Sequence, residues 1–585
     1  MRPPHRVMED ASNSAGPVVL AVDDDAAALA RIERELTQRY GWDYDVVCEL
    51  SPRAAAAALR TMQDEGARVA IVLAAQWMSE AEGTELLAEV GRLHPHAKRG
   101  LLIDWGAWGH QPTAEAIFRG MAQRHMDYYL MKPLQAGDEQ FHRTVVEFLH
   151  EWSRAQSPAA NEITLVARRW SVRGHELRSL LARNGVPHAF LSSDSDAGRR
   201  ALRELGAEVA DAPVAIMHDG RVLVDPTRSE LAAAFGVDTE LHGERHFDLA
   251  VVGAGPAGLT AAVYASSEGL RTLVVEREAI GGQAGSSSLI RNYLGFSRGV
   301  SGAELAQRAY QQAWVFGTSF LLMREVTELR PADGGLALGV EGIGEVTADA
   351  VLLATGVSYR RIGIPSLEEL VGAGVFYGAS IAEARHLAGD HVYVVGGGNS
   401  AGQAVMHLSH YTKEVTLLAR RNTLAETMSQ YLREELDATA NVQVRLGAEV
   451  VGGGGRRRLE RLVLRDSPSG DEHEVDAAGL FLLIGGDPHT AWLPNDIERD
   501  RGGYLLTGLD LVRGGRVVEC WPLERSPQVM ETSMPGVFAA GDVRHSSINR
   551  VASAVGDGSV VVSQVNRLIG RRRSPDRSPP SRSQH

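Results

Sequence analysis

A glycine-rich turn near the middle of the chain is the first pattern that could do chemistry. The apolar run Leu249–Val252 leads into Gly253-Ala-Gly255-Pro-Ala-Gly258, and a helical pattern follows. In a GxGxxG turn the first glycine permits the sharp bend, and the second lets the backbone approach a pyrophosphate. The third allows close helix–strand packing, with the phosphate at the helix N-terminus. The alternative is a glycine turn with a purely structural role.

An acidic residue supports the ligand-binding interpretation of this turn. The next apolar run, Thr272–Val275, ends in Glu276, 23 residues after Gly253. A carboxylate at this place accepts hydrogen bonds from ribose hydroxyls. Glycines and acid together predict a dinucleotide site of the kind that binds FAD.

A second glycine-rich turn has the opposite charge pattern. Gly396 and Gly398 follow the apolar run Val392–Val395, and the next strand ends in Arg420 and Arg421. A carboxylate there would repel a 2′-phosphate, whereas guanidinium groups bind one. The second turn therefore predicts an NADPH site. The alternative for Arg420 and Arg421 is a solvated pair at a strand end.

Two shorter motifs fit the first site. Ala354-Thr355-Gly356 follows an apolar strand and marks where the chain would leave the first nucleotide domain. Gly541-Asp542 follows another, which places the Asp542 carboxylate where it can accept a hydrogen bond from a ribityl hydroxyl.

Length and composition indicate the number of domains and argue against nucleic-acid binding. The 585 residues correspond to about four domains at roughly 150 residues each. Lys and Arg number 60 against 74 Asp and Glu, so the net charge is −14, a poor match for nucleic acid. Glycine is frequent, with 62 residues, as expected where backbone turns tightly or approaches a ligand.

The number of cysteines and the composition of the N-terminus indicate in which cell compartment the protein works. Cys48 and Cys520 are the only two cysteines. No CxxC exists, which excludes a disulfide-stapled fold and a cysteine-rich metal site. The 20 histidines show no metal-ligand spacing. The first 16 residues lack the apolar core of a signal peptide, and the longest apolar run is too short to span a membrane. We expect a cytoplasmic protein without a metal.

The chain divides by composition. We expect disorder over 1–16, a strand–helix domain over 17–155, a linker over 156–161, a middle module over 162–240, and a disordered Arg/Ser/Pro-rich tail over 571–585. Repeated strand–helix units in the N-terminal domain imply a parallel sheet, with strands at 18–22, 69–74, 101–103 and 128–131. The middle module is predicted as strand 163–167, helix 175–183, strand 188–191, helix 197–205 and a hairpin over 214–224.

Residues 247–569 resemble the thioredoxin reductase-like family of FAD/NADPH flavoproteins, the class II pyridine nucleotide-disulfide oxidoreductases. The resemblance rests on GAGPAGLTAAVYASSEGL, IGGQAGSSSLIRNYLGF, GGGNSAGQA, LLARR and PGVFAAGDVRHSSINRVASA, in consistent order and spacing. It implies an FAD-binding domain over 246–358 and 483–570, with an NADPH-binding domain over 359–482 inserted into it.

The resemblance also implies individual contacts. Those to FAD would come from Gly253, Gly255, Pro256, Ala257, Gly258, Glu276, Gly282, Gln283, Asn292, Ala354, Gly356, Gly541 and Asp542. Those to NADPH would come from Gly396, Gly398, Asn399, Ser400, Arg420 and Arg421.

The sequence departs from this family at the redox dithiol. Thioredoxin reductases carry CxxC just after a Gly-Val-x-Tyr stretch, which here is Gly374–Tyr377. Gly378 and Ile381 stand where the two cysteines would be. Thiol–disulfide exchange needs sulfur, so ordinary thioredoxin reduction is not expected. Hydride transfer from NADPH to flavin belongs to the cofactors and stays available.

The two remaining domains resemble known folds with their reactive groups missing. The middle module resembles a thioredoxin or glutaredoxin fold, with Ala212-Pro213 where that fold often has a cis-proline. Its redox motif would fall at Trp170–Arg173, which contains no cysteine, so we expect a docking or spacer module.

The N-terminal domain resembles a response-regulator receiver. Asp23–Asp25 match its Mg²⁺-binding acids and Lys132 its lysine, but Ala75 stands at the phosphoacceptor position and Ile103 at the hydroxyl position. This pattern predicts a pseudo-receiver that acts in protein interaction.

These features predict a multidomain α/β protein: a flavodoxin-like receiver, a thioredoxin-like module and two Rossmann-like domains. Its expected function is NADPH-dependent flavin oxidoreduction that passes electrons directly to an external acceptor, such as a ferredoxin-like protein or a small molecule. The alternative is a redox- or NADPH-sensing flavoprotein that acts through its N-terminal modules. No nucleic acid or membrane partner is expected, and the sequence leaves a homodimer open.

Overall fold

The chain forms two compact units, residues 1–160 and 161–585. The computed structural model describes residues 16–107, 110–123, 125–156, 163–205, 212–237, 239–287, 289–378, 384, 387–467 and 469–573. Disorder was expected at both termini. Most of these residues, 1–15 and 574–585, lie outside the described residues. The last helix runs to Arg573, three residues into the expected tail, because arginine is a good helix former.

The first unit is a doubly wound α/β domain. Its parallel sheet has the order β2-β1-β3-β4-β5, the flavodoxin-like order. In chain order the elements are β1 (Val18–Val22), α1 (Ala26–Tyr40), β2 (Asp45–Glu49), α2 (Pro52–Asp64), β3 (Val69–Ala75), α3 (Gly83–Leu93), β4 (Lys98–Ile103), α4 (Gln111–Ala122), β5 (Tyr128–Met131) and α5 (Glu139–Gln156).

The helices of this unit cover both faces of its sheet. Apolar residues of α1 and α5 pack on one face, and those of α2 and α3 pack on the other. The four strands predicted from apolar runs are present. Strand β2 was not predicted because it is an edge strand whose side chains are only partly buried, so its apolar run is short.

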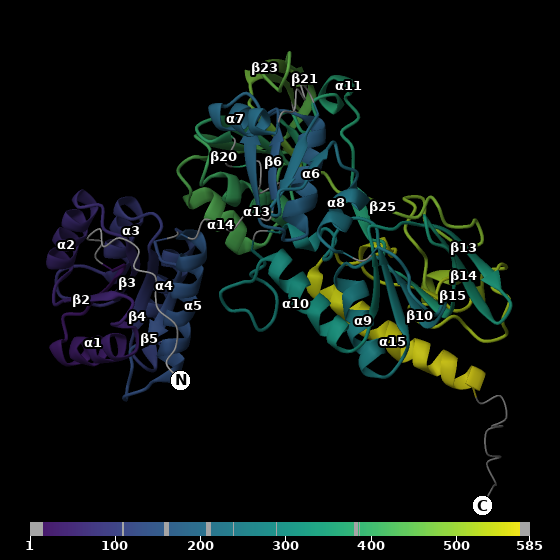
Figure 1. Ribbon diagram of the computed structural model, residues 1–585, viewed down its shortest axis with the longest axis horizontal. Helices are drawn as coiled ribbons and strands as arrows, with labels where there is room; N and C mark the ends of the chain where they lie inside the picture. Colours follow the sequence, from purple (N-terminus) through teal and green to yellow (C-terminus); the bar gives the residue numbers. More distant parts are fainter. Residues whose placement is uncertain are drawn as a thin grey trace, which may run out of the picture. The chain divides into compact units, whose positions relative to one another are not determined.

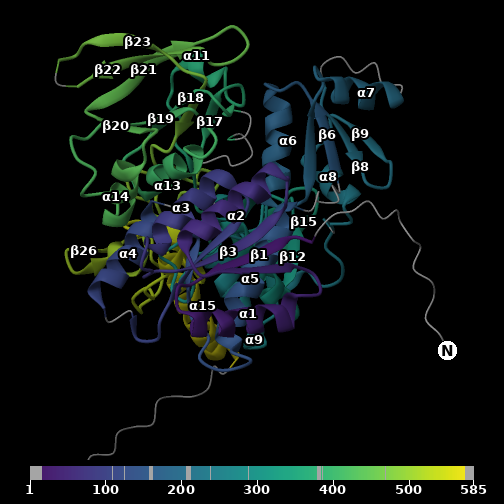
Figure 2. The same cartoon turned by 90° about the vertical axis from the view of Figure 1, so that its left-hand side faces the viewer.

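The second unit begins with the middle module, a four-stranded sheet of order β7-β6-β8-β9 (Figure 2). Strand β7 is parallel to β6, and the hairpin β8–β9 is antiparallel to it. The elements are β6 (Ile163–Ala167), α6 (Val172–Arg183), β7 (His188–Ser192), α7 (Asp196–Glu204), β8 (Val214–Met217), β9 (Val222–Val224) and α8 (Arg228–Ala234). The described backbone contains no cis peptide, so the bond before Pro213 is trans.

A seven-stranded sheet forms the next domain, of order β12-β11-β10-β15-β14-β13 with β28 beside β15. Its elements are β10 (His246–Val252), α9 (Pro256–Ser267), β11 (Thr272–Glu276), η2 (Ala284–Ser286), α10 (Gly302–Val315), β12 (Ser319–Leu322), β13 (Val326–Ala332), β14 (Gly335–Val340), β15 (Gly344–Leu353), η4 (Gly508–Leu511), β26 (Val512–Arg513), β27 (Arg516–Val517), β28 (Val537–Ala539), η5 (Gly541–Val543) and α15 (Val551–Arg573). Helices α9, α10 and α15 lie side by side on one face of the sheet (Figure 1).

A third domain of the second unit is inserted between β15 and β28. Its parallel sheet has the order β17-β24-β18-β19-β20, and the antiparallel sheet β21-β22-β23 lies at one end of the domain (Figure 2). The elements are α11 (Pro365–Glu368), β17 (Val375–Tyr377), β18 (His391–Val395), α13 (Asn399–Leu408), β19 (Glu414–Ala419), α14 (Gln430–Ala438), β20 (Val442–Leu446), β21 (Ala448–Gly454), β22 (Arg461–Asp466), β23 (Glu472–Asp476) and β24 (Gly479–Leu482).

The chain crosses between the last two domains on a two-stranded ribbon. Strand β16 (Val357–Tyr359) leaves the seven-stranded sheet domain, and the antiparallel β25 (Gly486–Pro488) returns to it. A ribbon of two strands is only marginally stable alone, so other contacts must fix the angle between the domains.

Candidate functional site

The turn between β10 and α9 has the geometry that a bound phosphate requires. Gly253 has φ +106°, and a Cβ on it would lie 2.4 Å from the Ala354 carbonyl oxygen. A Cβ on Gly258 would lie 1.9 Å from the Gly253 carbonyl oxygen. A Cβ on Gly255 would meet no atom within 4 Å, so Gly255 faces open space at the N-terminus of α9. Pro256 and Ala257 form the first turn of that helix.

Glu276 lies at the carboxyl end of β11, beside this turn. Its carboxylate accepts hydrogen bonds from three backbone amides: Ala254 at 2.7 Å, Glu278 at 2.7 Å and Ala279 at 3.2 Å. A carboxylate offers about four acceptor positions, so one is left for a ribose hydroxyl. The three amides also fix the loop that follows β11.

That loop returns to the glycine turn. The Gly281 amide donates to the Ala254 carbonyl at 2.8 Å, and a Cβ on Gly282 would lie 3.3 Å from the Gly255 Cα. Gln283 donates from Nε2 to the Val357 carbonyl, which ties the loop to the outgoing strand. The structure therefore brings Gly282 and Gln283 to the predicted site. Asn292 is exposed.

The carboxyl ends of β15 and β28 complete the site. Ala354 is buried, with its amide bonded to the Val252 carbonyl at 2.9 Å, and Gly356 has φ +62°. The Gly541 amide donates to Asp557 Oδ2 at 3.0 Å. Burial, followed by the charge of Asp557, raises the pKa of Asp542 to about 6. Asp542 is only partly buried, so its carboxyl group stays accessible to a hydroxyl group of a ligand.

The second glycine turn connects β18 with α13. A Cβ on Gly396 would lie 2.7 Å from the Leu483 carbonyl oxygen, whereas Gly398 has no close neighbour and caps α13. Asn399 accepts from the Ser429 amide at 2.7 Å, and Ser400 is exposed. Open backbone at a helix N-terminus is again what a pyrophosphate needs.

Both arginines lie exposed after β19. Arg421 pairs with Glu426 at 2.8 Å, and the two side chains are 62% and 65% exposed. Such a surface pair contributes little, so Arg421 can turn to an anionic group at small cost. The geometry therefore leaves Arg420 and Arg421 available to a 2′-phosphate at the strand end.

Gly378, one of the two positions where the resemblance would place the dithiol, is closely covered by an aromatic ring. It has φ +83°, and a Cβ on it would lie 2.6 to 2.7 Å from Cζ, Cε2 and the hydroxyl oxygen of Tyr359. Tyr359 is the last residue of β16, and burial raises the pKa of its hydroxyl. A cysteine at 378 would need this ring to move. Ile381 lies outside the described residues.

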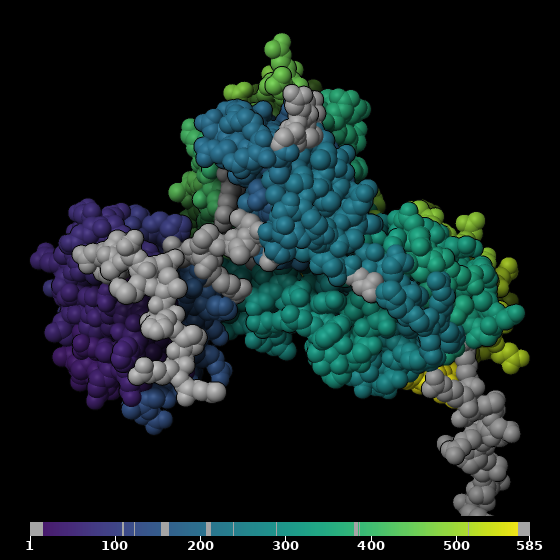
Figure 3. Space-filling view, viewed as in Figure 1, coloured from purple at the N-terminus to yellow at the C-terminus, as the bar shows by residue number. Residues whose placement is uncertain are grey.

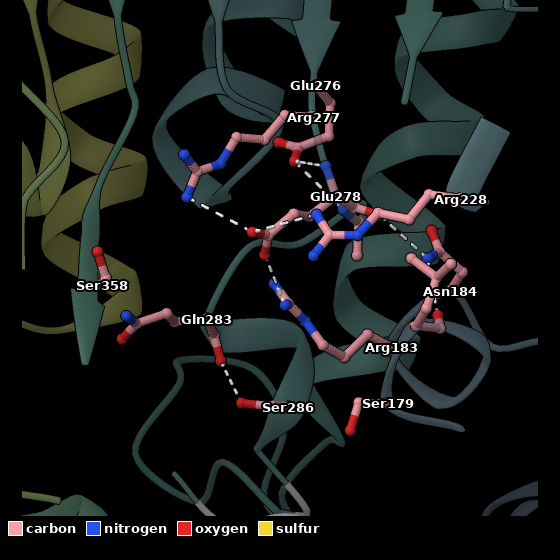
Figure 4. A network of polar contacts seen from close by, with 12 residues as sticks. Ser179, Arg183, Asn184, Arg228, Glu276, Arg277, Glu278, Gln283, Ser286 and Ser358 are labelled. Carbon is pink, nitrogen blue, oxygen red and sulfur yellow. Dashed lines mark hydrogen bonds and ion pairs between the residues drawn. The ribbon is translucent and has the colours of Figure 1, made fainter. Parts of the chain in front are cut away.

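A polar cluster beside Glu276 was not predicted from the sequence. Glu278 contacts Arg183 at 2.8 Å and Arg228 at 3.8 Å, both from the middle module, and Arg277 at 3.5 Å (Figure 4). Burial disfavours ionisation of Glu278, but these guanidinium groups, Arg183 foremost, hold its pKa below the usual value. No sequence pattern marks this cluster, because its members are up to 95 positions apart.

The acidic corner of the first unit is occupied by internal contacts. Lys132 Nζ lies 2.8 Å from Asp23 and 3.4 Å from Asp104. Burial alone would lower the pKa of Lys132, but these carboxylates raise it above its usual value. Asp25 caps α1 by accepting from the Ala27 and Ala28 amides.

Comparison with known proteins identifies relatives of the second unit. The family model described as pyridine nucleotide-disulphide oxidoreductase matches residues 247–558. The thioredoxin reductase of Treponema pallidum is 35% identical over 317 residues, which cover 54% of this chain and 95% of that protein. That of Bacillus subtilis is 32% identical over 332 residues, 56% of this chain and 96% of that protein. The crystal structure of Lactococcus lactis thioredoxin reductase matches with a TM-score of 0.50 and 25% identity, over 56% of this chain and 99% of that one.

The two glycine turns and these matches define the class of protein. The chain belongs to the pyridine nucleotide-disulphide oxidoreductase family. It is an NAD(P)H-dependent flavin oxidoreductase, thioredoxin reductase-like in residues 247–558, and its cofactors are FAD and NADPH. The open backbone at Gly255 and Gly398 fits both groups. No helix in the described part of the chain is both long and apolar enough to cross a bilayer.

Proposed function

We propose that this protein takes hydride from NADPH onto FAD and passes the electrons directly to an external acceptor, without an internal dithiol. When bound, FAD accepts the hydride and gives up its electrons singly or in pairs. The single observation that carries the proposal is at Gly378, where a Cβ would lie 2.6 Å from the Tyr359 ring and φ is +83°, a backbone conformation unfavourable to cysteine.

Assigned roles follow the geometry. Glu276 would bind a ribose hydroxyl and fix the β11 loop, while the open backbone of Gly255 would accept the FAD pyrophosphate. Asp542, which is partly buried, would bind a ribityl hydroxyl. The backbone at Gly398 would bind the NADPH pyrophosphate, and Arg420 and Arg421 would bind its 2′-phosphate. We assign the FAD-binding domain to 246–358 and 483–570, and the NADPH-binding domain to 359–482.

The other domains are proposed as interaction modules. The sheet order of the first unit and the Asp23–Lys132 pair support a pseudo-receiver, with Ala75 at the end of β3 in place of a phosphoacceptor. The sheet of the middle module supports a thioredoxin-like fold without a redox motif. A ferredoxin-like protein or a small molecule is the proposed acceptor. Two free cysteines and the use of NADPH favour the cytoplasm.

An anaerobic titration with two readouts tests the proposal. We expect NADPH to bleach the flavin faster than NADH does, and the bleached protein to reduce ferricyanide or a ferredoxin. Thiol titration should count two thiols per chain before and after NADPH, because only Cys48 and Cys520 exist and both are free. New thiols after reduction would contradict the direct route, and a flavin that neither nucleotide bleaches would contradict the enzyme.

A second candidate function is redox or NADPH sensing. It is favoured by one observation: the middle module contacts both the FAD-binding and the NADPH-binding domain, through Glu278 and through Gly372. Slow turnover with every acceptor, together with a partner interaction that depends on NADPH, would favour this alternative. Fast turnover with one acceptor would count against it.

A further inference from the structure

Helix α6 of the middle module touches two domains at once. Its 12 residues correspond to a rod of about 18 Å. Its first turn lies on the NADPH-binding domain, and its last turn lies on the FAD-binding domain. In the space-filling view the module lies against both (Figure 3).

The first turn of α6 is anchored by aromatic packing. Trp170, just before the helix, packs against the apolar clusters on both faces of the β17–β24 sheet. The Arg458 guanidinium lies 5.6 Å from its ring centroid. One turn later, the ring centroids of His175 and Phe376 are 5.3 Å apart. These contacts join the helix to strand β17, which ends one residue before Gly378.

A glycine permits this close approach. Gly372 has φ +82°, and a Cβ on it would lie 3.0 Å from the His175 Cβ and 3.2 Å from the Val172 Cα. Any side chain at 372 would push α6 away from the NADPH-binding domain.

The last turn of α6 is anchored by polar contacts. Arg183 Nη1 lies 2.8 Å from Glu278 Oε2, and Asn184 Nδ2 donates to the Glu278 carbonyl at 3.2 Å (Figure 4). The Glu278 amide in turn donates to Glu276. The end of the helix is thus bonded to the loop that directly follows Glu276, the predicted FAD ribose ligand.

We propose that α6 is a strut that sets the angle between the FAD-binding and NADPH-binding domains. The inference rests on the domain assignment given above. Among the described residues, the two domains are also joined by the ribbon β16–β25, by a hydrogen bond between Tyr359 and Ser286, and by the ion pair of Arg291 with Glu435. A rigid helix held at both ends removes the rotation that a two-stranded ribbon leaves open. Release of either end restores that rotation.

The angle can be measured with two spin labels in the full-length, FAD-loaded, oxidised protein. Cys520 is exposed in the FAD-binding domain, and Lys413→Cys adds an exposed site in the NADPH-binding domain, with Cys48→Ser removing the third thiol. We expect one narrow distance distribution in this background. Trp170→Ala and Arg183→Ala should each broaden this distance distribution.

Non-additivity identifies a strut rather than two independent contacts. Because a strut needs both ends, the double variant Trp170→Ala/Arg183→Ala should broaden the distribution no more than the stronger single variant. Arg199→Ala is the matched arginine control, since Arg199 pairs with Asp196 within the module. Its distribution should stay narrow.

A glycine pair provides a second matched comparison. Gly372→Ala adds a methyl group against α6, whereas Gly389→Ala adds one at φ +81° with no atom within 4 Å. Both carry the same backbone penalty, but only Gly372→Ala should broaden the distances. Bound-flavin absorbance shows that each variant is folded. Narrow distances in Trp170→Ala, Arg183→Ala and Gly372→Ala would overturn the strut, as would equal broadening in the controls. No NADPH is present, so failure of the electron-transfer proposal would not alter this result.

Discussion

At the scale of single residues, Asp542 is a proposed ligand residue whose ionised form opposes folding. It is partly buried, and this burial, followed by the charge of Asp557, raises its pKa from 3.8 to about 6. In the FAD-free protein the folded form keeps this proton where the unfolded chain has lost it. Stability should therefore fall as the pH rises from about 4 to about 6, and the full penalty is present at pH 7.

Substitution of this carboxyl group tests that account. Asp542→Asn should stabilise the FAD-free protein at pH 7 by on the order of 2 kcal/mol and flatten its pH dependence between about pH 4 and 6. The same change should weaken FAD binding, because a hydroxyl partner loses its anionic acceptor. Denaturant unfolding across this pH range and FAD titration measure the two effects. Asp510→Asn, at an exposed position, is the control. An unchanged pH dependence of stability in Asp542→Asn would show that Asp542 does not cause the loss of stability with rising pH.

Arg420 and Arg421 carry the prediction on nucleotide choice. Loss of two charge-assisted contacts to a 2′-phosphate should reduce the NADPH-over-NADH preference of Arg420→Ala/Arg421→Ala by about 10²-fold or more. The effect should fall on the KM for NADPH, because the 2′-phosphate is remote from the transferred hydride. Stopped-flow flavin reduction with both nucleotides measures it. Arg461→Ala removes an exposed arginine paired with Glu474 elsewhere in the domain and should leave the preference intact.

At the scale of elements, the β10–α9 turn separates folding from binding. A Cβ on Gly258 would collide with the Gly253 carbonyl, whereas one on Gly255 meets open space. Gly258→Ala should therefore destabilise the domain by roughly 2–4 kcal/mol, since backbone must shift. Gly255→Ala should fold normally and lose FAD, because its methyl group occupies the expected position of the pyrophosphate. Melting of the FAD-free variants, together with FAD retention on purification, separates these cases. Full FAD binding by Gly255→Ala would refute the assignment.

The sequence predicted the features that depend on nearby residues, and it missed the contacts between segments far apart in the chain. Both glycine turns and Glu276 follow from requirements within a few dozen residues: a sharp bend, a buried strand before it and an acid at the end of the next strand. The contacts of Glu278 with Arg183 and of Gly378 with Tyr359 could not be predicted. The first contact joins two domains, and the second packs the last residue of the ribbon strand β16 against the residue that follows β17. No local sequence pattern marks either pair.

At the scale of the whole molecule, the chain has two compact units with separate cores. If each unfolds cooperatively by itself, scanning calorimetry of the full chain should show two transitions. The proposed FAD site lies in the second unit, and at 100 times its Kd a ligand adds about 2.7 kcal/mol to the folded state. Removal of FAD should therefore lower one transition by a few degrees and leave the other unchanged.

A core substitution in the first unit provides the reciprocal test. Leu20 is fully buried in β1, so Leu20→Ala should cost about 2–5 kcal/mol there and lower only the transition that FAD does not affect. Two independent transitions would mean that changes in the first unit have no effect on the stability of the flavin site, as expected if the first unit is the separate interaction module that we propose. If both perturbations moved a single common transition, folding energy would be shared between the units. The first unit could then bias the flavin site, and the sensing alternative would gain the coupling that it needs.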